Sequence, residues 1–278
     1  MKTKIAVITG PTSGIGKVTT LALAQLGFRL VLVARNEDKA KALLGEIGNP
    51  SDAVFLKTDL SDLQSVKETV KMIRQHCNQI DLLVNNAGLI VDEKVFSVNG
   101  IELTFASNHL GHFLLTTELI DLLRVSEDAR IVHVSSEAHR FARFKAEELV
   151  NPPRYLHFIV YANSKLANVL FSNELAERYR GDGITSNALH PGTISSGFGG
   201  ASRGLVKWFV NLGKPFFKNV EQGALTSLYL ATSADVRGKT GGYYENQKLV
   251  SASRAAQNKE NALKLWELSE SLVRHYRA

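Results

Sequence analysis

Short apolar runs alternate along this chain with longer segments that have helical periodicity. The runs are rich in valine, isoleucine and leucine and lack polar alternation, which is typical of strands buried on both faces in a parallel sheet. They predict strands at residues 4–8, 29–33, 53–57, 80–84, 130–134, 185–189 and 242–245. Helices are predicted at residues 14–26, 37–47, 63–76, 102–123, 162–179, 222–231 and 258–275. The pattern predicts an α/β fold with a doubly wound, mostly parallel seven-stranded sheet flanked by helices.

Length, charge and cysteine content limit the class of protein. At 278 residues the chain has room for one large α/β domain, so we expect residues 1–278 to form a single domain. Lysine and arginine exceed aspartate and glutamate by 33 to 27, but no dense basic tract results, and nucleic-acid binding is not expected. Cys77 is the only cysteine, so no intramolecular disulfide can form. The first predicted strand leaves no room for a signal peptide, and no apolar run reaches the roughly 18–20 residues of a spanning helix, so we expect a cytoplasmic protein.

Three glycines lie between the first predicted strand and the first predicted helix, in the sequence Thr9-Gly10-Pro11-Thr12-Ser13-Gly14-Ile15-Gly16. Backbone N–H groups at the positive end of a helix dipole bind pyrophosphate, and glycine has no Cβ to block its approach. The G-x-x-x-G-x-G spacing differs from the commoner G-x-G-x-x-G, and a glycine cluster alone is also compatible with an ordinary turn. Its position between strand and helix favours a dinucleotide-binding domain of the Rossmann type. The predicted cofactor contacts of this loop are Gly10, Thr12, Ser13, Gly14, Ile15 and Gly16.

The end of the second predicted strand indicates which dinucleotide binds. NAD enzymes of this fold carry an acidic residue there for the ribose 2′-hydroxyl, whereas NADP enzymes supply a cation for the 2′-phosphate. Here Ala34 occupies the acidic position and Arg35 follows it. The arginine fork suits bidentate phosphate binding, and Lys39 adds positive charge nearby. The sequence therefore predicts NADP(H), with a simple surface arginine at a strand end as the alternative reading of Arg35.

Three motifs occur in order along the chain: the glycine loop, Asn85-Asn86-Ala87-Gly88 after the fourth predicted strand, and Tyr161-Ala162-Asn163-Ser164-Lys165. Together they resemble the short-chain dehydrogenase/reductase family, and the resemblance covers essentially the whole chain. Within that family the chain is most similar to the retinol dehydrogenase-like branch, through residues 108–113, 164–171, 190–193 and 265–269 and a long stretch between Ser136 and Tyr161. The resemblance implies an oxidoreductase that interconverts a carbonyl and an alcohol by hydride transfer.

The resemblance also implies four catalytic residues, Asn108, Ser136, Tyr161 and Lys165. Hydride transfer to a carbonyl builds negative charge on its oxygen, so a proton donor and a hydrogen-bond donor must face that oxygen. Tyr161 is the expected acid/base and Ser136 the expected hydrogen-bond donor, with neighbouring Ser135 as the alternative. Lys165 lies four residues after Tyr161, on the same helical face, and is expected to lower the pKa of the phenol from about 10. Asn108 matches the family position that anchors a water in the proton relay.

Further cofactor contacts transfer from the family residue by residue. They are Asp59 and Leu60 beside the adenine, Asn86, Ala87 and Gly88 at the adenosine ribose, Lys165 with Tyr161 at the nicotinamide ribose, and Pro191, Gly192 and Thr193 at the nicotinamide carboxamide. The threonine that usually follows a few positions later is replaced by Ser195 or Ser196. Family members usually pair through the two long helices predicted at 102–123 and 162–179, so a homo-oligomer is expected.

Two segments that interrupt the strand–helix rhythm, 137–156 and 195–220, are predicted to wall the substrate pocket. Both follow carboxyl ends of predicted strands, where ligands bind in open α/β sheets. An amphipathic helix is predicted in the second segment from the spacing of Leu205, Trp208, Phe209 and Leu212. As a lid it implies a small lipophilic carbonyl or alcohol substrate, such as a retinoid, a steroid or a lipid. As a surface anchor, residues 204–214 would give peripheral membrane contact.

For several histidines and arginines the sequence gives weaker evidence of a functional role. His109 and His112 lie three residues apart on one predicted helix, but no third ligand has suitable spacing, so packing roles and no bound metal are expected. His139, Arg140 and Arg143 either line the pocket or are solvated in a loop.

Two other functions stay open beside the oxidoreductase. One is a non-catalytic NADP(H)-binding sensor or scaffold, since a fold alone does not guarantee chemistry; the intact set of catalytic residue types argues against it. The other is a reductase of carbon–carbon double bonds, which reuses the tyrosine and the lysine.

Overall fold

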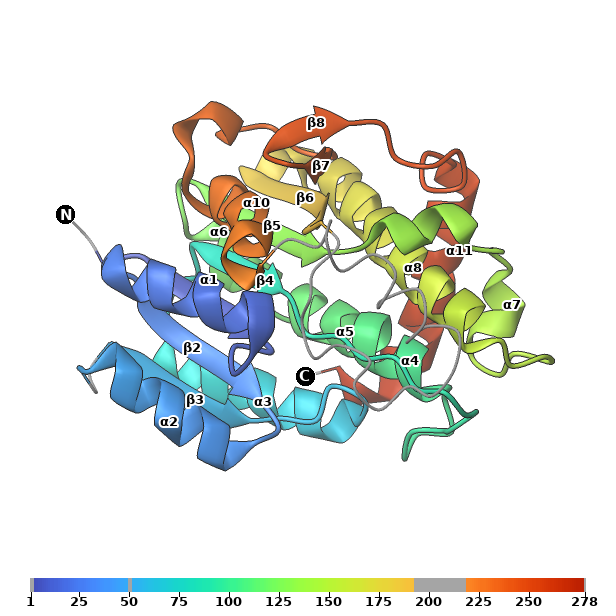
Figure 1. Ribbon diagram of the computed structural model, residues 1–278, viewed down its shortest axis with the longest axis horizontal. Helices are drawn as coiled ribbons and strands as arrows, with labels where there is room; N and C mark the ends of the chain where they lie inside the picture. Colours follow the sequence, from blue (N-terminus) through green and yellow to red (C-terminus); the bar gives the residue numbers. More distant parts are fainter. Residues whose placement is uncertain (1–2, 50–51, 193–218, 278) are drawn as a thin grey trace.

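The computed structural model describes residues 3–49, 52–192 and 219–277, and in these ranges an eight-stranded sheet is covered by helices on both faces (Figure 1). The strands are β1 (Ile5–Thr9), β2 (Arg29–Ala34), β3 (Ala53–Lys57), β4 (Leu82–Asn85), β5 (Ala129–Val134), β6 (Ile184–His190), β7 (Tyr243–Glu245) and β8 (Lys248–Val250). Their order is β3-β2-β1-β4-β5-β6-β7-β8, and all neighbours are parallel except β7 and β8. The expected α/β fold of the Rossmann type, with a mostly parallel sheet, is confirmed.

The predicted number of seven strands is wrong by one. β8 returns antiparallel to β7 after a tight turn in which Asn246 and Gln247 have φ angles of 52° and 62°. It is a three-residue edge strand in which Lys248 and Leu249 are exposed. Because an edge strand need not be buried on both faces, β8 lacks the continuous apolar run that marks the inner strands.

The order of the strands reverses at β1. The chain runs outward from β1 to β2 and β3 and then returns to β4 on the other side of β1. Ile8 is in register with Leu32 of β2 and with Val84 of β4, so the carboxyl ends of these strands are level. Ligands bind in open sheets at such a switch point, because the loops leaving the two sides diverge there. The glycine loop and the Asn86 segment both begin at this point.

Helices of two layers enclose the sheet. One face carries α1 (Gly14–Gln25), α2 (Glu37–Ile47) and α10 (Val220–Thr232), and the other carries α3 (Leu63–His76), α5 (Gly111–Thr117), α8 (His157–Arg178) and α11 (Lys259–Val273). Ile8 packs with the first layer and its neighbour Val7 with the second. Shorter elements are α4 (Leu103–Phe105), α6 (Ile120–Arg124), α7 (Ala146–Leu149), η2 (Glu137–Phe141), η3 (Arg180–Asp182), η5 (Ala234–Val236) and η6 (Arg274–Tyr276).

The single helix predicted at 102–123 is divided in the structure. Glu102 caps α4, with its carboxylate accepting hydrogen bonds from Thr104 N at 2.9 Å and Phe105 N at 2.7 Å. A π-helical segment, η1 (Ala106–Leu110), then leads into α5, and α6 follows after a break. The pattern of apolar residues cannot reveal a π turn, because such a turn changes only the local winding of an otherwise helical segment. A second boundary also differs, since α8 begins at His157 and not at residue 162.

Helix α11 lies against α5 and α8. The rings of Trp266 in α11 and Phe113 in α5 are 4.9 Å apart between centroids, and the Arg178 guanidinium lies 4.2 Å from the Trp266 ring centroid. His109 Nε2 and Ser269 Oγ are hydrogen-bonded at 2.9 Å. The two helices through which a homo-oligomer was expected to pair therefore contact a helix of the same chain.

The two predicted pocket segments differ in how far the structure describes them. Residues 137–156 form η2, α7 and the turns around them. Of residues 195–220, only the last two lie in the described ranges, where Asn219 caps α10. The predicted amphipathic stretch 204–214 lies outside the described residues. Among the helices of the described ranges, none combines the length and apolar character needed to cross a membrane.

Gly111, at the start of α5, is expected to tolerate no side chain. A Cβ on Gly111 would lie 2.1 Å from the carbonyl oxygen of Leu60, a backbone atom that cannot turn away. We therefore expect Gly111→Ala to lower the free energy of unfolding by about 1–3 kcal/mol or more, the usual cost of overpacking. Urea denaturation followed by circular dichroism measures this change.

Gly45→Ala is the matched control. Gly45 is an exposed residue of α2, and a Cβ there meets no atom within 4 Å. Because alanine favours a helix over glycine by about 0.5–1 kcal/mol, this variant should be as stable as the parent or more so. Equal unfolding free energies for the two variants would contradict the close contact between α5 and Leu60.

Candidate active site

The predicted site residues come from neighbouring strand ends at one edge of the sheet. The glycine loop follows β1, the segment 86–88 follows β4, Ser136 follows β5, and residues 191–192 follow β6. Tyr161 and Lys165 belong to α8, and Asn108 belongs to η1. Because these strands are parallel, their carboxyl ends bring the loops together.

The loop after β1 is bound tightly to the segment after β4. Asn86 donates from Nδ2 to Thr9 O at 2.9 Å and to Gly10 O at 3.0 Å. In return, Thr9 Oγ1 accepts hydrogen bonds from Asn86 N at 2.9 Å and Ala87 N at 3.0 Å. A Cβ on Gly16 would lie 2.1 Å from Gly10 O, so only glycine fits there. The two segments therefore form one closely packed unit.

The start of α1 offers hydrogen-bond donors next to open space. Gly14 has a φ of +52°, and a Cβ on it would meet no atom within 4 Å. Ser13 is the N-cap residue, and within the described ranges its side chain makes no capping hydrogen bond. The N–H groups of the first helical turn lack intrahelical partners and carry the positive end of the helix dipole. These features suit a pyrophosphate, so the residues present fit the predicted dinucleotide.

Arg35 follows β2 and Asp59 follows β3, the two strands on the same side of β1, which carries the glycine loop. Arg35 is exposed directly after β2, and the loop is fastened to the same strand by a hydrogen bond from Gly10 N to Val33 O at 2.9 Å. Asp59 follows β3, and its Oδ1 already accepts hydrogen bonds from the N and Oγ of Ser61 at 2.9 and 2.7 Å. Arg35 therefore keeps a solvent-facing charge beside the loop, whereas Asp59 shapes its own turn.

The remaining predicted cofactor residues are less exposed. Leu60 is buried under α5, with its carbonyl against Gly111. Pro191 is buried after β6, and Gly192 has a φ of 94°, a left-handed conformation that favours glycine. Thr193, Ser195 and Ser196 lie outside the described residues.

Two adjacent serines at the end of β5 have different partners. Ser135 is buried and donates from Oγ to Lys165 O at 2.7 Å. Ser136 caps η2, where its Oγ accepts a hydrogen bond from Ala138 N at 3.2 Å, and its side chain acts to lower the pKa of Tyr161. Successive side chains of an extended segment point to opposite sides. Of the two serines, Ser136 is the one that shares its surroundings with Tyr161.

Lys165 lies between α8 and the ends of β4 and β5. Its Nζ donates to Val134 O at 3.1 Å and lies 5.6 Å from the Tyr161 ring centroid. A Cβ on Gly88 would lie 3.2 Å from Lys165 Nζ and 3.5 Å from Asn108 Oδ1. The backbone after β4 therefore reaches both side chains directly.

Burial favours the neutral form of both Tyr161 and Lys165. It raises the pKa of Tyr161 to about 12, although the Ser136 side chain acts in the other direction. It lowers the pKa of Lys165 to about 8. The pKa of Tyr161 is therefore raised, and not lowered as expected, because burial has the largest effect on the phenol. Lys165, and not Tyr161, therefore titrates near neutral pH.

The Asn108 side chain joins the segment after β4 to α8. Its Oδ1 accepts from Leu89 N at 2.7 Å, and its Nδ2 donates to Leu89 O at 2.9 Å and to Ser164 Oγ at 3.0 Å. Both amide hydrogens are therefore used in holding the walls of the site. Asn108 lies within the π-helical segment η1, and such segments occur frequently at functional sites.

Sequence reasoning missed two hydroxyl groups of this network. Thr9 receives two backbone N–H groups, and Ser164 links Asn108 to α8 by donating to Tyr161 O at 2.7 Å. Thr9 could have been found from its position, because it is a hydroxyl residue at the end of an apolar strand, directly before a glycine loop. Ser164 gave no signal of its own, because it lies inside a motif read only for its tyrosine and lysine.

The structure distinguishes the three residues of segment 137–156 for which the sequence allowed either a pocket position or a solvated loop. His139 is buried, donates from Nδ1 to Ser136 O at 2.7 Å and accepts at Nε2 from Ser253 N at 3.0 Å. Arg140 and Arg143 are exposed, and Arg140 forms an ion pair with Glu137. In the described part of the chain, no group of three or more histidine, cysteine or acidic side chains is arranged to hold a metal ion.

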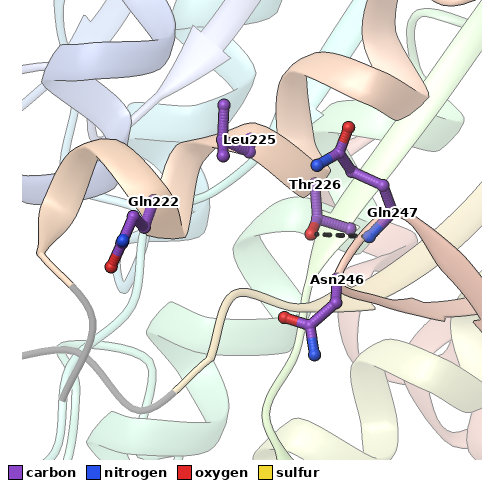
Figure 2. Close-up of a pocket in the computed structure, with 5 residues that line it drawn as sticks. All are labelled: Gln222, Leu225, Thr226, Asn246 and Gln247. Carbon is purple, nitrogen blue, oxygen red and sulfur yellow. Dashed lines mark hydrogen bonds between the residues drawn. The ribbon is translucent and has the colours of Figure 1, made fainter. Parts of the chain in front are cut away.

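A separate pocket of about 220 Å³ lies between α10 and the turn that joins β7 to β8. Figure 2 shows its lining residues, which are Gln222, Leu225, Thr226, Asn246 and Gln247. Gln247 N donates to Thr226 Oγ1 at 3.3 Å, which closes one side of the pocket. This lining includes none of the predicted catalytic or cofactor residues.

Comparison with known proteins gives a consistent set of relatives. The family model of the short chain dehydrogenases matches residues 4–204. Mouse retinol dehydrogenase 12 is 38% identical over 273 residues, which cover 97% of this chain and 86% of that protein. Mouse retinol dehydrogenase 14 is 35% identical, with 98% of this chain and 86% of that protein covered. A solved structure from Mycobacterium paratuberculosis has a TM-score of 0.79 at 31% identity, over 98% of this chain and 93% of that chain.

Proposed function

Because the chain belongs to the short-chain dehydrogenase family, we propose that this oxidoreductase uses NADP(H) to interconvert a carbonyl and an alcohol on a lipophilic substrate, with Tyr161 as acid/base. The observation that carries the proposal is the meeting of α8 with the end of β5, where Lys165 Nζ donates to Val134 O at 3.1 Å and the Ser136 side chain acts on the pKa of the Tyr161 phenol. It puts two hydroxyl groups side by side, at the same sheet edge as a glycine loop that fits a dinucleotide. A substrate oxygen between these hydroxyls would meet a proton donor and a hydrogen-bond donor together.

Tyr161 and Ser136 have complementary tasks in this proposal. During reduction the substrate oxygen gains negative charge, and Tyr161 passes its phenolic proton to that oxygen. Ser136 stabilises the same charge by a hydrogen bond, a contribution that is typically worth about 3–4 kcal/mol of barrier. In the oxidation of an alcohol, the Tyr161 oxygen takes the proton back.

Lys165 and Asn108 support the tyrosine. Charged Lys165, about one helical turn from Tyr161, favours the negative charge that remains on the phenol oxygen after proton transfer. Asn108 holds Leu89 and Ser164, and through them the relative positions of the segment after β4 and the helix that carries Tyr161. We infer that Asn108 acts through these neighbours and through the water that its position anchors in the family.

NADP(H), when bound, supplies or accepts the hydride. The residues that would hold it are those of the glycine loop, with Asn86, Ala87 and Gly88 beside them and Lys165 at the nicotinamide end. Preference for the 2′-phosphate is assigned to Arg35, which is exposed after β2 with Ala34 in place of an acidic residue. An arginine fork gives a phosphate two parallel charged hydrogen bonds.

A lipophilic substrate is supported by the relatives and by the surface beside Tyr161. The two retinol dehydrogenases carry the name of a lipophilic alcohol, and each aligns with nearly the whole chain. Phe158 lies one turn before Tyr161 on α8, and its ring is 5.7 Å from that of Phe141 at the end of η2. Both side chains are exposed, which provides an apolar surface near the reacting hydroxyls.

Removal of one hydroxyl tests the chemistry. Tyr161→Phe should keep the fold and the affinity for NADPH while kcat for carbonyl reduction falls by about 10²–10⁴, the range for a positioned acid/base. Initial rates with aldehydes and ketones of increasing lipophilicity measure kcat. Tyr229→Phe, which removes a phenol hydroxyl from α10, should leave kcat within a few-fold of the parent. Near-parent turnover in Tyr161→Phe would favour the non-catalytic sensor.

Turnover should also depend on pH through Lys165. We expect the rate of carbonyl reduction to fall as pH rises through about 8, because Lys165 then loses the charge that stabilises the forming tyrosinate. Tyr161 stays protonated over this range, since its pKa is raised to about 12. The residual activity of Lys165→Met should lack this transition. An identical pH profile in the parent and in Lys165→Met would exclude Lys165 as its source.

Cofactor preference is tested at the end of β2. Arg35→Ala should weaken NADPH binding by about 1.5–3 kcal/mol, the usual contribution of charged hydrogen bonds. NADH lacks the 2′-phosphate, so its dissociation constant should hardly change and serves as the internal control. Fluorescence titration with both cofactors measures the two constants, and equal losses for both would reject the assignment.

A further inference from the structure

His112 connects the glycine-loop unit with the π-helical segment that carries Asn108. It lies on α5 and is fully buried. Its Nε2 lies 2.8 Å from Thr9 Oγ1, and its Nδ1 lies 3.0 Å from Asn108 O. One imidazole therefore spans the distance between the strand end before the cofactor loop and the backbone of a predicted catalytic residue.

The partners of the ring determine where its proton lies. Asn108 O can only accept a hydrogen bond, so Nδ1 carries the hydrogen. Burial lowers the pKa of His112 to about 4, which leaves the ring neutral with a single proton. Nε2 is then an acceptor, and the Thr9 hydroxyl donates to it. The orientation of each hydrogen bond in this chain is thus fixed.

The Thr9 hydroxyl uses its whole hydrogen-bonding capacity in this arrangement. It donates to His112 Nε2 and accepts from the backbone N–H groups of Asn86 and Ala87. A hydroxyl has one donor and two acceptor positions, so none is left over. If the acceptor at His112 is removed, Thr9 keeps only the longer contact to Val84 O at 3.3 Å, and its acceptor positions turn away from Asn86 and Ala87.

Other buried histidines of the core are held differently. His109 leaves Nδ1 and His133 leaves Nε2 without a hydrogen-bond partner among the described residues. Both pack against the ring of Phe171, at 5.5 and 5.2 Å between centroids. The other ring nitrogen of each is bonded, His109 Nε2 with Ser269 Oγ at 2.9 Å and His133 Nδ1 with Asn85 Nδ2 at 3.4 Å. His112, in contrast, has a partner for each ring nitrogen, and both partners belong to the site.

We propose that His112 is a positioning residue with two separable tasks, one at each ring nitrogen. Through Nε2 it orients Thr9 and so the Asn86–Ala87 backbone of the cofactor cradle. Through Nδ1 it holds the carbonyl of Asn108, and so the π-helical segment that ties Leu89 to α8. The inference rests on the proposed function and adds to it a residue expected from sequence to have only a packing role.

Two substitutions separate the tasks. In His112→Asn, the side-chain NH₂ takes the place of Nδ1 and keeps the bond to Asn108 O, while Thr9 loses its acceptor. In His112→Gln, the longer side chain places its oxygen near the position of Nε2 and keeps Thr9, while Asn108 O loses its donor. We expect about a 3–10-fold higher Kd for NADPH with unchanged kcat in the first variant, the effect of one hydrogen bond. In the second we expect about a 3–10-fold lower kcat with unchanged Kd.

The control is His109→Gln, on the same stretch of chain and equally buried, which should change neither quantity. NADPH fluorescence gives Kd without any turnover, and single-turnover reduction gives the rate of the chemical step. Circular dichroism and urea denaturation show whether each variant is folded. The Asn variant is expected to change only Kd and the Gln variant only kcat. A general loss of stability would not separate the two quantities in this way.

A double-mutant cycle keeps the inference testable in a second way. Thr9→Val removes the hydroxyl at the other end of the bond between Thr9 and His112. The double variant Thr9→Val/His112→Asn should therefore raise the Kd for NADPH by markedly less than the product of the two single effects. Multiplicative effects, or equal changes of Kd and kcat in the Asn and Gln variants, would overturn the role of His112. A parent protein that binds NADPH but reduces no carbonyl would defeat the proposed function alone, and the Kd cycle would still decide the link between His112 and Thr9.

Discussion

The candidate site depends on a contact between two pieces of backbone that leaves no space for side-chain atoms. The glycine loop after β1 and the segment after β4 touch because Gly16 lacks a Cβ and because Asn86 bonds the carbonyls of Thr9 and Gly10. This contact fixes the direction in which α1 starts. It also brings Gly88 against Lys165. A wider gap would separate the cofactor loop from the residues proposed to carry the chemistry.

Desolvation explains why the electrostatics of the site differ from the simple picture of a lysine beside a tyrosine. Both groups are in an environment that penalises charge, so each shifts towards its neutral form. The Ser136 side chain acts to lower the pKa of the Tyr161 phenol, and Lys165 Nζ lies 5.6 Å from the centroid of the Tyr161 ring. The same low polarity strengthens each hydrogen bond of the network.

The sequence contains most of the fold and part of the site. The inner strands were predictable because burial on both faces leaves an uninterrupted apolar run. β8 was not predictable, because an edge strand with exposed Lys248 and Leu249 has no such run. The residues of the motifs predicted to be catalytic lie at the same edge of the sheet, where Ser135 bonds Lys165 O and Ser136 acts on the pKa of Tyr161. The hydrogen bonds of Thr9 and His112 were not predicted, because their partners are distant in sequence and no local pattern records a tertiary hydrogen bond.

The position of α11 has a consequence for the order in which the protein forms during synthesis. The apolar rings of Phe113 and Phe171 are covered by Trp266, which leaves the ribosome only after β6, α10, β7 and β8 have done so. Until then, α5 and α8 expose the aromatic surface that lies next to the site. The nascent chain therefore exposes an apolar surface for much of its synthesis. Such transient exposure favours aggregation and binding by chaperones. This layer of the core is therefore completed only after α8 has emerged from the ribosome.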